Sequence, residues 1–154
     1  MNIAQVRSQF SVYVLAPNLE QGKNTLTALS AVQYTSELFD NKKTLLERMT
    51  KEPSHILVVH LDSVIKSFQD FMVEMNESFP ELLTIVIGDR EYGRVLKEYA
   101  RFGVYQFLSK SEDLESELIW AVDRASEHLY LIYQNETLAG QCEAHKNHDL
   151  QAKD

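Results

Sequence analysis

The sequence predicts an α/β domain in which a parallel β-sheet is covered by helices on both faces. Five short runs of apolar and β-branched residues alternate along the chain with segments whose apolar residues recur every three or four positions. Strands that alternate with helices form parallel sheets, because right-handed crossovers carry each helix back over the sheet. The 154 residues, 44% of them hydrophobic, are enough for one domain with a two- or three-layer core.

The five predicted strands end at turn-forming residues. The first run, SVYVL, stops before Pro17, and the second stops before Asp40 and Asn41. The third run follows Pro53 and contains no polar residue, which is typical of a strand buried on both faces. The fourth run ends at Gly88. The predicted strands are Ser11–Leu15, Tyr34–Phe39, Ile56–Val59, Leu82–Ile87 and Val104–Leu108.

Apolar residues at helical spacing predict a helix after each strand. Asn41 is a suitable N-cap for the second helix, and Gly103 ends the fourth. The last helix opens at Ser111 or Glu112, and helix-forming residues continue beyond its apolar stripe as far as Gly140. The predicted helices are 19–32, 42–52, 64–79, 90–102 and 111–139.

The apolar pattern divides the chain at about residue 133. Residues 1–133 contain all five strands and the helices that cover them, so they form the predicted domain. Residues 134–154 are expected to continue the last helix and then to become a polar tail or linker. Residues 141–154 contain no core pattern, which favours a tail.

Composition and motifs exclude several classes of protein. The net charge of −8 argues against a surface for nucleic acid or for an anionic membrane. Cys142 is the single cysteine and cannot form an internal disulfide, and no stretch reaches the roughly 18–20 apolar residues of a membrane span. Glycine-rich phosphate loops and nucleophile elbows are absent from the sequence. We therefore expect a cytoplasmic protein that is not an enzyme and that binds no cofactor or metal.

The second half of the sequence resembles one family. Residues 103–111, GVYQFLSKS, are similar to the segment Gly-Ala-x-x-Tyr/Phe-Leu-x-Lys-Pro of response-regulator receiver domains in two-component signalling. The resemblance extends from about residue 10 to 133 and implies a flavodoxin-like sheet in the strand order 2-1-3-4-5, here with an extended C-terminal helix. It places Lys110 at the family's lysine and Phe107 at its aromatic switch position, whereas Ser111 replaces the proline.

The first half departs from this family at its chemical positions. Receiver domains carry an acidic pair after the first strand, where this chain has Ala16 and Pro17. The phosphoacceptor aspartate at the end of the third strand aligns with His60, and the hydroxyl residue at the end of the fourth aligns with Gly88. Mg²⁺ prefers carboxylate or carbonyl oxygens in near-octahedral geometry, and phosphorylation of an aspartate needs the metal to neutralise the phosphoryl oxygens. The sequence therefore predicts an atypical receiver, or pseudo-receiver, that works without phosphorylation.

Two other functions remain open at the same edge of the sheet. Asp62 could act as the phosphoacceptor if the register of the third strand were shifted, and this alternative alone requires Mg²⁺. Asp62 is also suited to an N-cap of the following helix. A third interpretation is a sensor of a small ligand or anion in a pocket around His60, Gly88 and Lys110. Lys110 can instead pair with Asp62 or Asp89.

A module without catalysis is expected to act through protein contacts. The predicted partners are an output domain, a kinase or another effector, and a second copy of the chain in a homodimer. One predicted contact surface lies on the fourth helix and fifth strand, and the other is a seam along the extended last helix. The residues assigned to these surfaces are Tyr99, Phe102, Tyr105, Phe107, Leu118, Ala125, Leu129 and Ile132.

Overall fold

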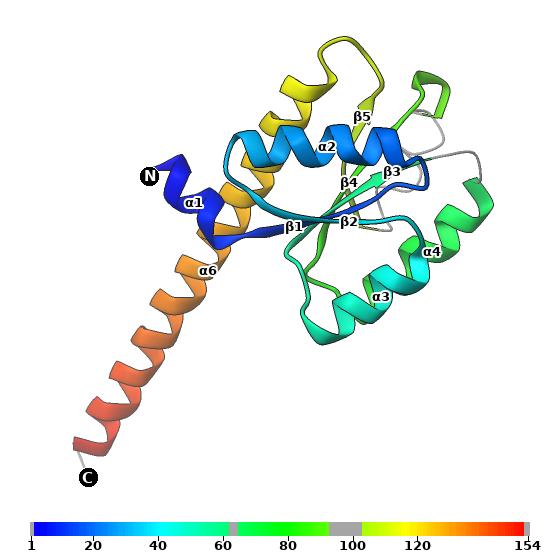
Figure 1. The fold of residues 1–154 in the computed structure, drawn as a ribbon. Helices are drawn as coiled ribbons and strands as arrows, with labels where there is room; N and C mark the ends of the chain where they lie inside the picture. The colour runs from blue at the N-terminus through cyan, green and yellow to red at the C-terminus, as the bar shows by residue number, and fades with distance from the viewer. Residues whose placement is uncertain (1, 62–64, 93–102, 153–154) are drawn as a thin grey trace.

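The computed structural model describes residues 2–61, 65–92 and 103–152. Its centre is a five-stranded parallel sheet in the order β2-β1-β3-β4-β5 (Figure 1). This is the flavodoxin-like order, so the predicted fold class is confirmed. The strands are β1 (Ser11–Leu15), β2 (Thr35–Phe39), β3 (Ile56–His60), β4 (Leu83–Gly88) and β5 (Val104–Ser109).

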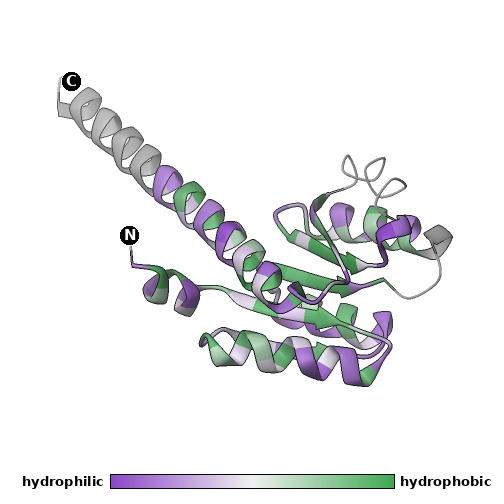
Figure 2. Cartoon of the chain, turned by 90° about the horizontal axis from the view of Figure 1, so that it is seen from above, coloured by the Kyte–Doolittle hydropathy of each residue, from purple (hydrophilic) through white to green (hydrophobic). Residues whose placement is uncertain are grey.

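Helices cover both faces of the sheet. Helices α2 (Leu19–Ala31) and α6 (Leu114–Ala152) lie on one face, and α3 (Lys42–Lys51) and α4 (Ile65–Ser78) lie on the other (Figure 1). The side chains of β3 alternate between two hydrophobic cores, one under α2 and α6 and the other under α3 and α4. Every residue of β3 is buried, which explains why its sequence is an unbroken apolar run. In Figure 2 the strands are mostly hydrophobic, whereas the helices are striped.

Asparagine side chains cap the starts of three helices: Asn2 at the helix that precedes the sheet, Asn18 at α2 and Asn41 at α3. The Oδ1 atom of Asn18 accepts a hydrogen bond of 3.1 Å from the backbone N–H of Gln21 at the start of α2. Asn41 does the same for Thr44 at 2.9 Å at the start of α3, as the sequence predicted. Each bond satisfies a backbone donor that has no partner within the helix.

The last helix is longer than predicted, and the predicted helix 90–102 is described at its start alone. Of the predicted helix 90–102, the structure describes a short 3-10 helix, η1 (Arg90–Tyr92), and the remainder lies outside the described residues. Helix α6 continues through Gly140 to Ala152 and projects from the domain (Figure 1). A single glycine costs a helix only about 1 kcal/mol relative to alanine, so it need not end one. None of the helices in the described ranges is long and apolar enough to cross a membrane.

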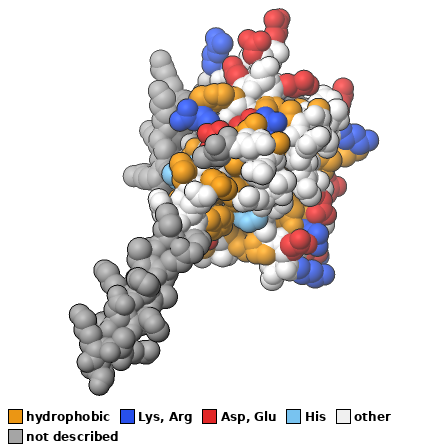
Figure 3. Space-filling view, turned by 90° about the vertical axis from the view of Figure 1, so that its left-hand side faces the viewer, with side chains coloured by type: hydrophobic (Ala, Val, Ile, Leu, Met, Phe, Trp, Pro, Cys, Tyr) orange, Lys and Arg blue, Asp and Glu red, His pale blue; other side chains and the backbone are white. Residues whose placement is uncertain are grey.

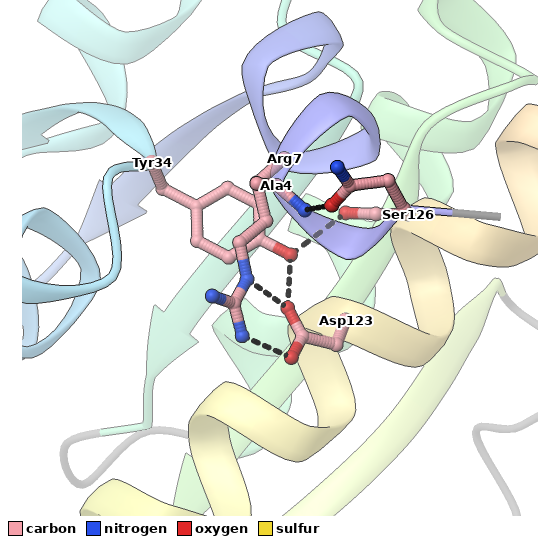
Figure 4. Close-up of polar contacts among 6 residues, drawn as sticks. Ala4, Arg7, Tyr34, Asp123 and Ser126 are labelled. Carbon is pink, nitrogen blue, oxygen red and sulfur yellow. Dashed lines mark hydrogen bonds and ion pairs between the residues drawn. The ribbon is translucent and has the colours of Figure 1, made fainter.

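An additional helix, α1 (Ile3–Gln9), precedes the sheet and was not predicted. Its Arg7 forms a group of polar side chains with Asp123 and Ser126 of α6 and with Tyr34, which directly precedes β2 (Figure 4). We term these four residues the α1–α6 polar cluster. The guanidinium of Arg7 donates two hydrogen bonds to the Asp123 carboxylate, at 2.8 and 2.6 Å. The Tyr34 hydroxyl donates to the same carboxylate at 2.5 Å and lies 3.1 Å from the Ser126 hydroxyl.

Candidate functional site

The carboxyl ends of the strands bring three of the predicted site residues to one edge of the sheet. His60 ends β3, Gly88 ends β4, and Lys110 follows β5 directly. The backbone N–H of Lys110 donates a 3.0 Å hydrogen bond to the carbonyl of Gly88, which holds the β5 end against the β4 end. Asp62, the alternative phosphoacceptor, lies outside the described residues.

His60 is held by a chain of hydrogen bonds that runs into α2. Its side chain is 5% exposed, and its Nε2 lies 2.6 Å from the hydroxyl of Thr25. That hydroxyl donates its proton to the carbonyl of Gln21 at 3.1 Å. Because a hydroxyl has one proton, we assign Nε2 as the donor toward Thr25. An Nε2 atom that carries a proton has no lone pair with which to attack a phosphoryl group.

The positions of the acidic pair provide no ligands for Mg²⁺. Ala16 is completely buried and Pro17 is exposed, and neither has a side-chain oxygen. The amide oxygen of Asn18 is occupied as the N-cap of α2. Across the part of the chain that the structure describes, no three His, Cys, Asp or Glu side chains gather as metal ligands do. The described residues at these positions therefore do not supply the carboxylate oxygens that an Mg²⁺ site needs.

Lys110 pairs with Asp89 at the same edge, which is one of the two predicted partners. Its Nζ lies 3.8 Å from Oδ1 of Asp89, and the two side chains are 29% and 53% exposed. Ion pairs with this exposure contribute little to stability, about 0–1 kcal/mol. Among the residues that the structure describes, the lysine thus has a weak, partly exposed ion pair at the sheet edge.

Gly88 allows an aromatic ring to pack where a side chain would otherwise lie. A Cβ atom at position 88 would be 3.3 Å from Cε2 of Phe107 and 3.4 Å from Cβ of Leu61. Phe107 packs against the core under α3 and α4. The ring of Phe107 therefore lies in the space that a side chain at position 88 would need.

The predicted aromatic surface on β5 is divided between the two faces of the sheet. The pairing of β4 with β5 shifts between Thr84 and Ile85, which pair with Val104 and Gln106 and leave Tyr105 as an extra residue. Such a β-bulge reverses the alternation of side chains. Tyr105 packs on the α2 and α6 side and Phe107 on the other, so they do not share one surface.

Most of the other residues of the predicted contact surfaces are either outside the described residues or buried in the domain. Tyr99 and Phe102 lie outside the described residues. Leu118, Ala125 and Leu129 were assigned to a seam between two chains. They lie in the domain's own core, with exposures of 2%, 0% and 4%. The α6 stripe that was interpreted as a seam instead packs on the sheet. Of the predicted seam, Ile132 is exposed, at 37%.

A cavity of about 260 Å³ opens between α2 and α6, beside His60. It contains His60 and Lys110 of the predicted ligand pocket but not Gly88, and its α2 and α6 residues were not predicted. Four of its residues are spaced along α2 at i, i+3, i+4 and i+7, so they form one stripe of the helix. This stripe is mostly polar. Polar residues at helical spacing on α2 were therefore the signal in the sequence that could have indicated the cavity. The cavity is lined by Gln21, Asn24, Thr25, Ala28, His60, Lys110, Ser111, Glu112, Leu114, Glu115 and Leu118.

Comparison with known proteins finds matches by structure and none by sequence. No model of a known protein family matches the sequence, and no curated protein matches it. Among solved structures, NtrX from Brucella abortus in complex with ADP matches with a TM-score of 0.75 and 16% identity over 84% of this chain. The chain spans 29% of the length of NtrX.

Two smaller structures match along nearly their whole lengths. A response-regulator receiver domain protein from Clostridium thermocellum has a TM-score of 0.71 and 14% identity, over 80% of this chain and 98% of its own. HP1043, an orphan response regulator of Helicobacter pylori, has a TM-score of 0.67 and 12% identity, over 78% and 98%. At these identities the likeness establishes the fold. The chain has the flavodoxin-like fold that receiver domains share.

Proposed function

We propose that the chain is a signalling module of the receiver type that works without phosphorylation and acts by contact with a protein partner. The observation that carries this proposal is the environment of His60. The resemblance to receiver domains aligns His60 with their phosphoacceptor, and this histidine is buried with its Nε2 bonded to Thr25. The neighbouring positions, Ala16 and Gly88, offer no oxygen ligand, so charge on a phosphoryl group would meet only Lys110 and backbone N–H groups.

The test exposes the protein to a phosphoryl donor and to a mimic of the phosphorylated state. Intact mass is measured after treatment with acetyl phosphate and Mg²⁺, and amide NMR spectra are recorded with and without Mg²⁺ and beryllofluoride. A receiver domain with its complete acidic set is treated in parallel to show that the reagents are active. We expect no added phosphoryl mass and no shifts at Gly88 or Lys110.

A matched variant identifies the acceptor if the result is different. A phosphoryl adduct on the natural sequence would overturn the proposal. Its loss in Asp62→Asn would show that the chain is a functional phosphoreceiver with a shifted register. Retention of the adduct in that variant, with loss in His60→Gln, would place the phosphoryl group on the histidine.

We further propose that the partner includes a second copy of the chain, bound along α6. Leu131 and Ile132 are 49% and 37% exposed at the point where α6 leaves the domain. Figure 3 shows hydrophobic side chains on the face from which the helix projects, with charged side chains mostly around its rim. A helix without tertiary contacts is marginally stable in water, so the projecting part of α6 favours association with another helix.

The oligomeric state tests this second proposal. Sedimentation velocity of the full chain is expected to show a dimer, and Leu131→Asp combined with Ile132→Asp is expected to give a monomer. Asn135→Asp is the matched control, because it adds charge to the same exposed segment without removing apolar surface. A monomer for the natural sequence, or a dimer that survives the double substitution, would contradict the α6 contact.

A further inference from the structure

The cavity between α2 and α6 contains His60, Thr25 and Lys110, which also enter the proposed function, together with groups of α2 and α6 that the proposed function does not use. It lies beside the sheet edge, and its volume of about 260 Å³ is slightly below the range of roughly 300–1,000 Å³ for pockets that hold drug-sized ligands. Two of its polar side chains, Thr25 and His60, are each 5% exposed and are fixed by their mutual hydrogen bond. The cavity therefore has a rigid polar wall and room for a small molecule.

Charges around the cavity favour a ligand that carries both signs. Lys110 supplies one positive charge, and Glu112 and Glu115 supply two negative charges. Two carboxylates beside one ammonium disfavour a multiply charged anion such as phosphate, since like charges repel. A zwitterion can place its carboxylate near Lys110 and its ammonium near the glutamates.

Gln21 adds a requirement for a hydrogen-bond donor. Its Oε1 is a buried acceptor that receives no hydrogen bond from the residues that the structure describes, and the residue lines the cavity. A buried acceptor without a partner costs about 1–3 kcal/mol, so such atoms call for an explanation. An ammonium group donates three hydrogen bonds and would satisfy this oxygen.

The rest of the cavity wall is apolar. Ala28, Leu114 and Leu118 line it together with the polar groups, and Leu118 is 2% exposed. These side chains would contact the hydrocarbon part of a ligand, because apolar groups gain from leaving water. Ionic groups of both signs, a buried acceptor and an apolar wall together match one chemical class.

We propose that this cavity binds a free α-amino acid with a small or aliphatic side chain. The carboxylate lies toward Lys110, the ammonium toward Gln21 and Glu115, and the side chain against Leu114 and Leu118. Binding would join α2 to the first turn of α6, and α6 is the helix that leaves the domain. The site does not depend on whether the chain is phosphorylated, so it can fail or succeed separately from the proposed function.

The experiment titrates the full chain with each of the twenty common L-amino acids and with inorganic phosphate. Amide NMR shifts are followed at Thr25, His60, Lys110 and Glu115. We expect at least one amino acid to shift these resonances together in a saturable way. Its analogues that lack the carboxylate or the amino group should bind about tenfold more weakly or worse, because each removes a charged hydrogen bond.

Two variants with a matched control assign the contacts. Lys110→Met and Gln21→Met should each weaken binding of the active amino acid by about tenfold or more. Lys23→Met should leave it unchanged, because Lys23 is exposed on the same helix and does not line the cavity. Absence of saturable shifts with all twenty amino acids overturns the proposal, as does binding of phosphate alone or binding that Lys110→Met leaves intact.

Discussion

Two polar clusters lie on the same side of the sheet. They differ in whether the polar groups find their hydrogen-bond partners within the protein, and we call the cluster that does so closed and the other open. In the α1–α6 polar cluster the Asp123 carboxylate receives two hydrogen bonds from Arg7 and one from Tyr34 (Figure 4). Charged groups that bond in this way retain in the folded state much of the hydrogen bonding they would have in water. The cluster needs nothing from outside, and it anchors α1.

The cluster beside His60 is open by comparison. The hydrogen bonds from His60 to Thr25 and from Thr25 to Gln21 fix one wall, but Oε1 of Gln21 accepts no hydrogen bond from the described residues. Gln21 lines a cavity, whereas Tyr34 of the α1–α6 polar cluster is packed in the core under α2 and α6. A closed cluster of this kind is expected in a structural role, and an open one marks a place for a ligand.

The largest effect is expected from breaking the closed cluster at its centre. Asp123→Ala leaves Arg7 and Tyr34 without their shared acceptor, and we expect a loss of about 2–4 kcal/mol in the free energy of unfolding. Urea unfolding monitored by circular dichroism measures this loss. Glu136→Ala, at an exposed acidic residue of the same helix, should change stability by no more than about 0.5 kcal/mol. Equal effects of the two substitutions would show that the cluster has no structural role.

A smaller loss is expected at the fixed wall of the open cluster. Thr25→Val keeps the shape of the side chain but removes the hydroxyl that accepts from His60, so we expect a loss of about 1–2 kcal/mol. Thr27→Val is the control, because the Thr27 hydroxyl makes the same kind of bond, to the carbonyl of Lys23 at 2.9 Å, on an exposed surface. Urea unfolding of the two variants separates burial of the histidine from the loss of a hydroxyl. If Thr27→Val costs as much, the bond to His60 contributes nothing specific.

Stability at high pH further tests the closed cluster. Burial and the hydrogen bond to Asp123 raise the pKa of the Tyr34 hydroxyl well above its usual value of about 10. The unfolded chain therefore loses this proton first, and the stability contributed by Tyr34 declines as pH rises above about 10. Tyr34→Phe should cost about 1 kcal/mol at neutral pH and should make this decline shallower. The pKa values of Tyr13 and Tyr133 are also raised, so some decline will persist. An unchanged slope in urea midpoints from pH 8 to 11 would contradict the assignment.

Sequence reasoning was sufficient for the sheet and insufficient for both polar clusters. Three strands were found because they contain compact runs of apolar residues, and the mixed runs of β2 and β5 were found between turn-forming residues and in the resemblance at residues 103–111. Strand order also followed from that resemblance. Helix α1 was missed because Val6 is its single buried residue, so seven residues show no periodicity. Arg7 and Asp123 are 116 positions apart, and charged residues at that separation resemble ordinary solvated surface.

The candidate site was predicted in its position but not in its geometry. His60, Gly88 and Lys110 were placed at the correct edge, because strand ends of a parallel sheet meet there. The division of Tyr105 from Phe107 was not predictable, since it depends on a one-residue shift in pairing with β4. A pocket at His60 and Lys110 was predicted, but its walls on α2 and α6 were not, because they depend on how far these two helices lie apart. Neither spacing nor composition encodes that distance.

The smallest effect has the opposite sign and is the sharpest test of the difference between the clusters. Gln21→Met replaces the buried oxygen that accepts no hydrogen bond with a thioether of similar length, and the two residues have similar helix propensity. Without ligand, the oxygen loses its hydrogen bonds to water on folding and gains none in their place. The free energy of unfolding of the variant should therefore be higher by about 0.5–1 kcal/mol. Gln69→Met, at an exposed position of α4, is the control and should change little. Urea unfolding in the absence of amino acids measures both variants. Destabilisation by Gln21→Met would mean that its amide is bonded within the protein, and the open cluster would then be closed like the other.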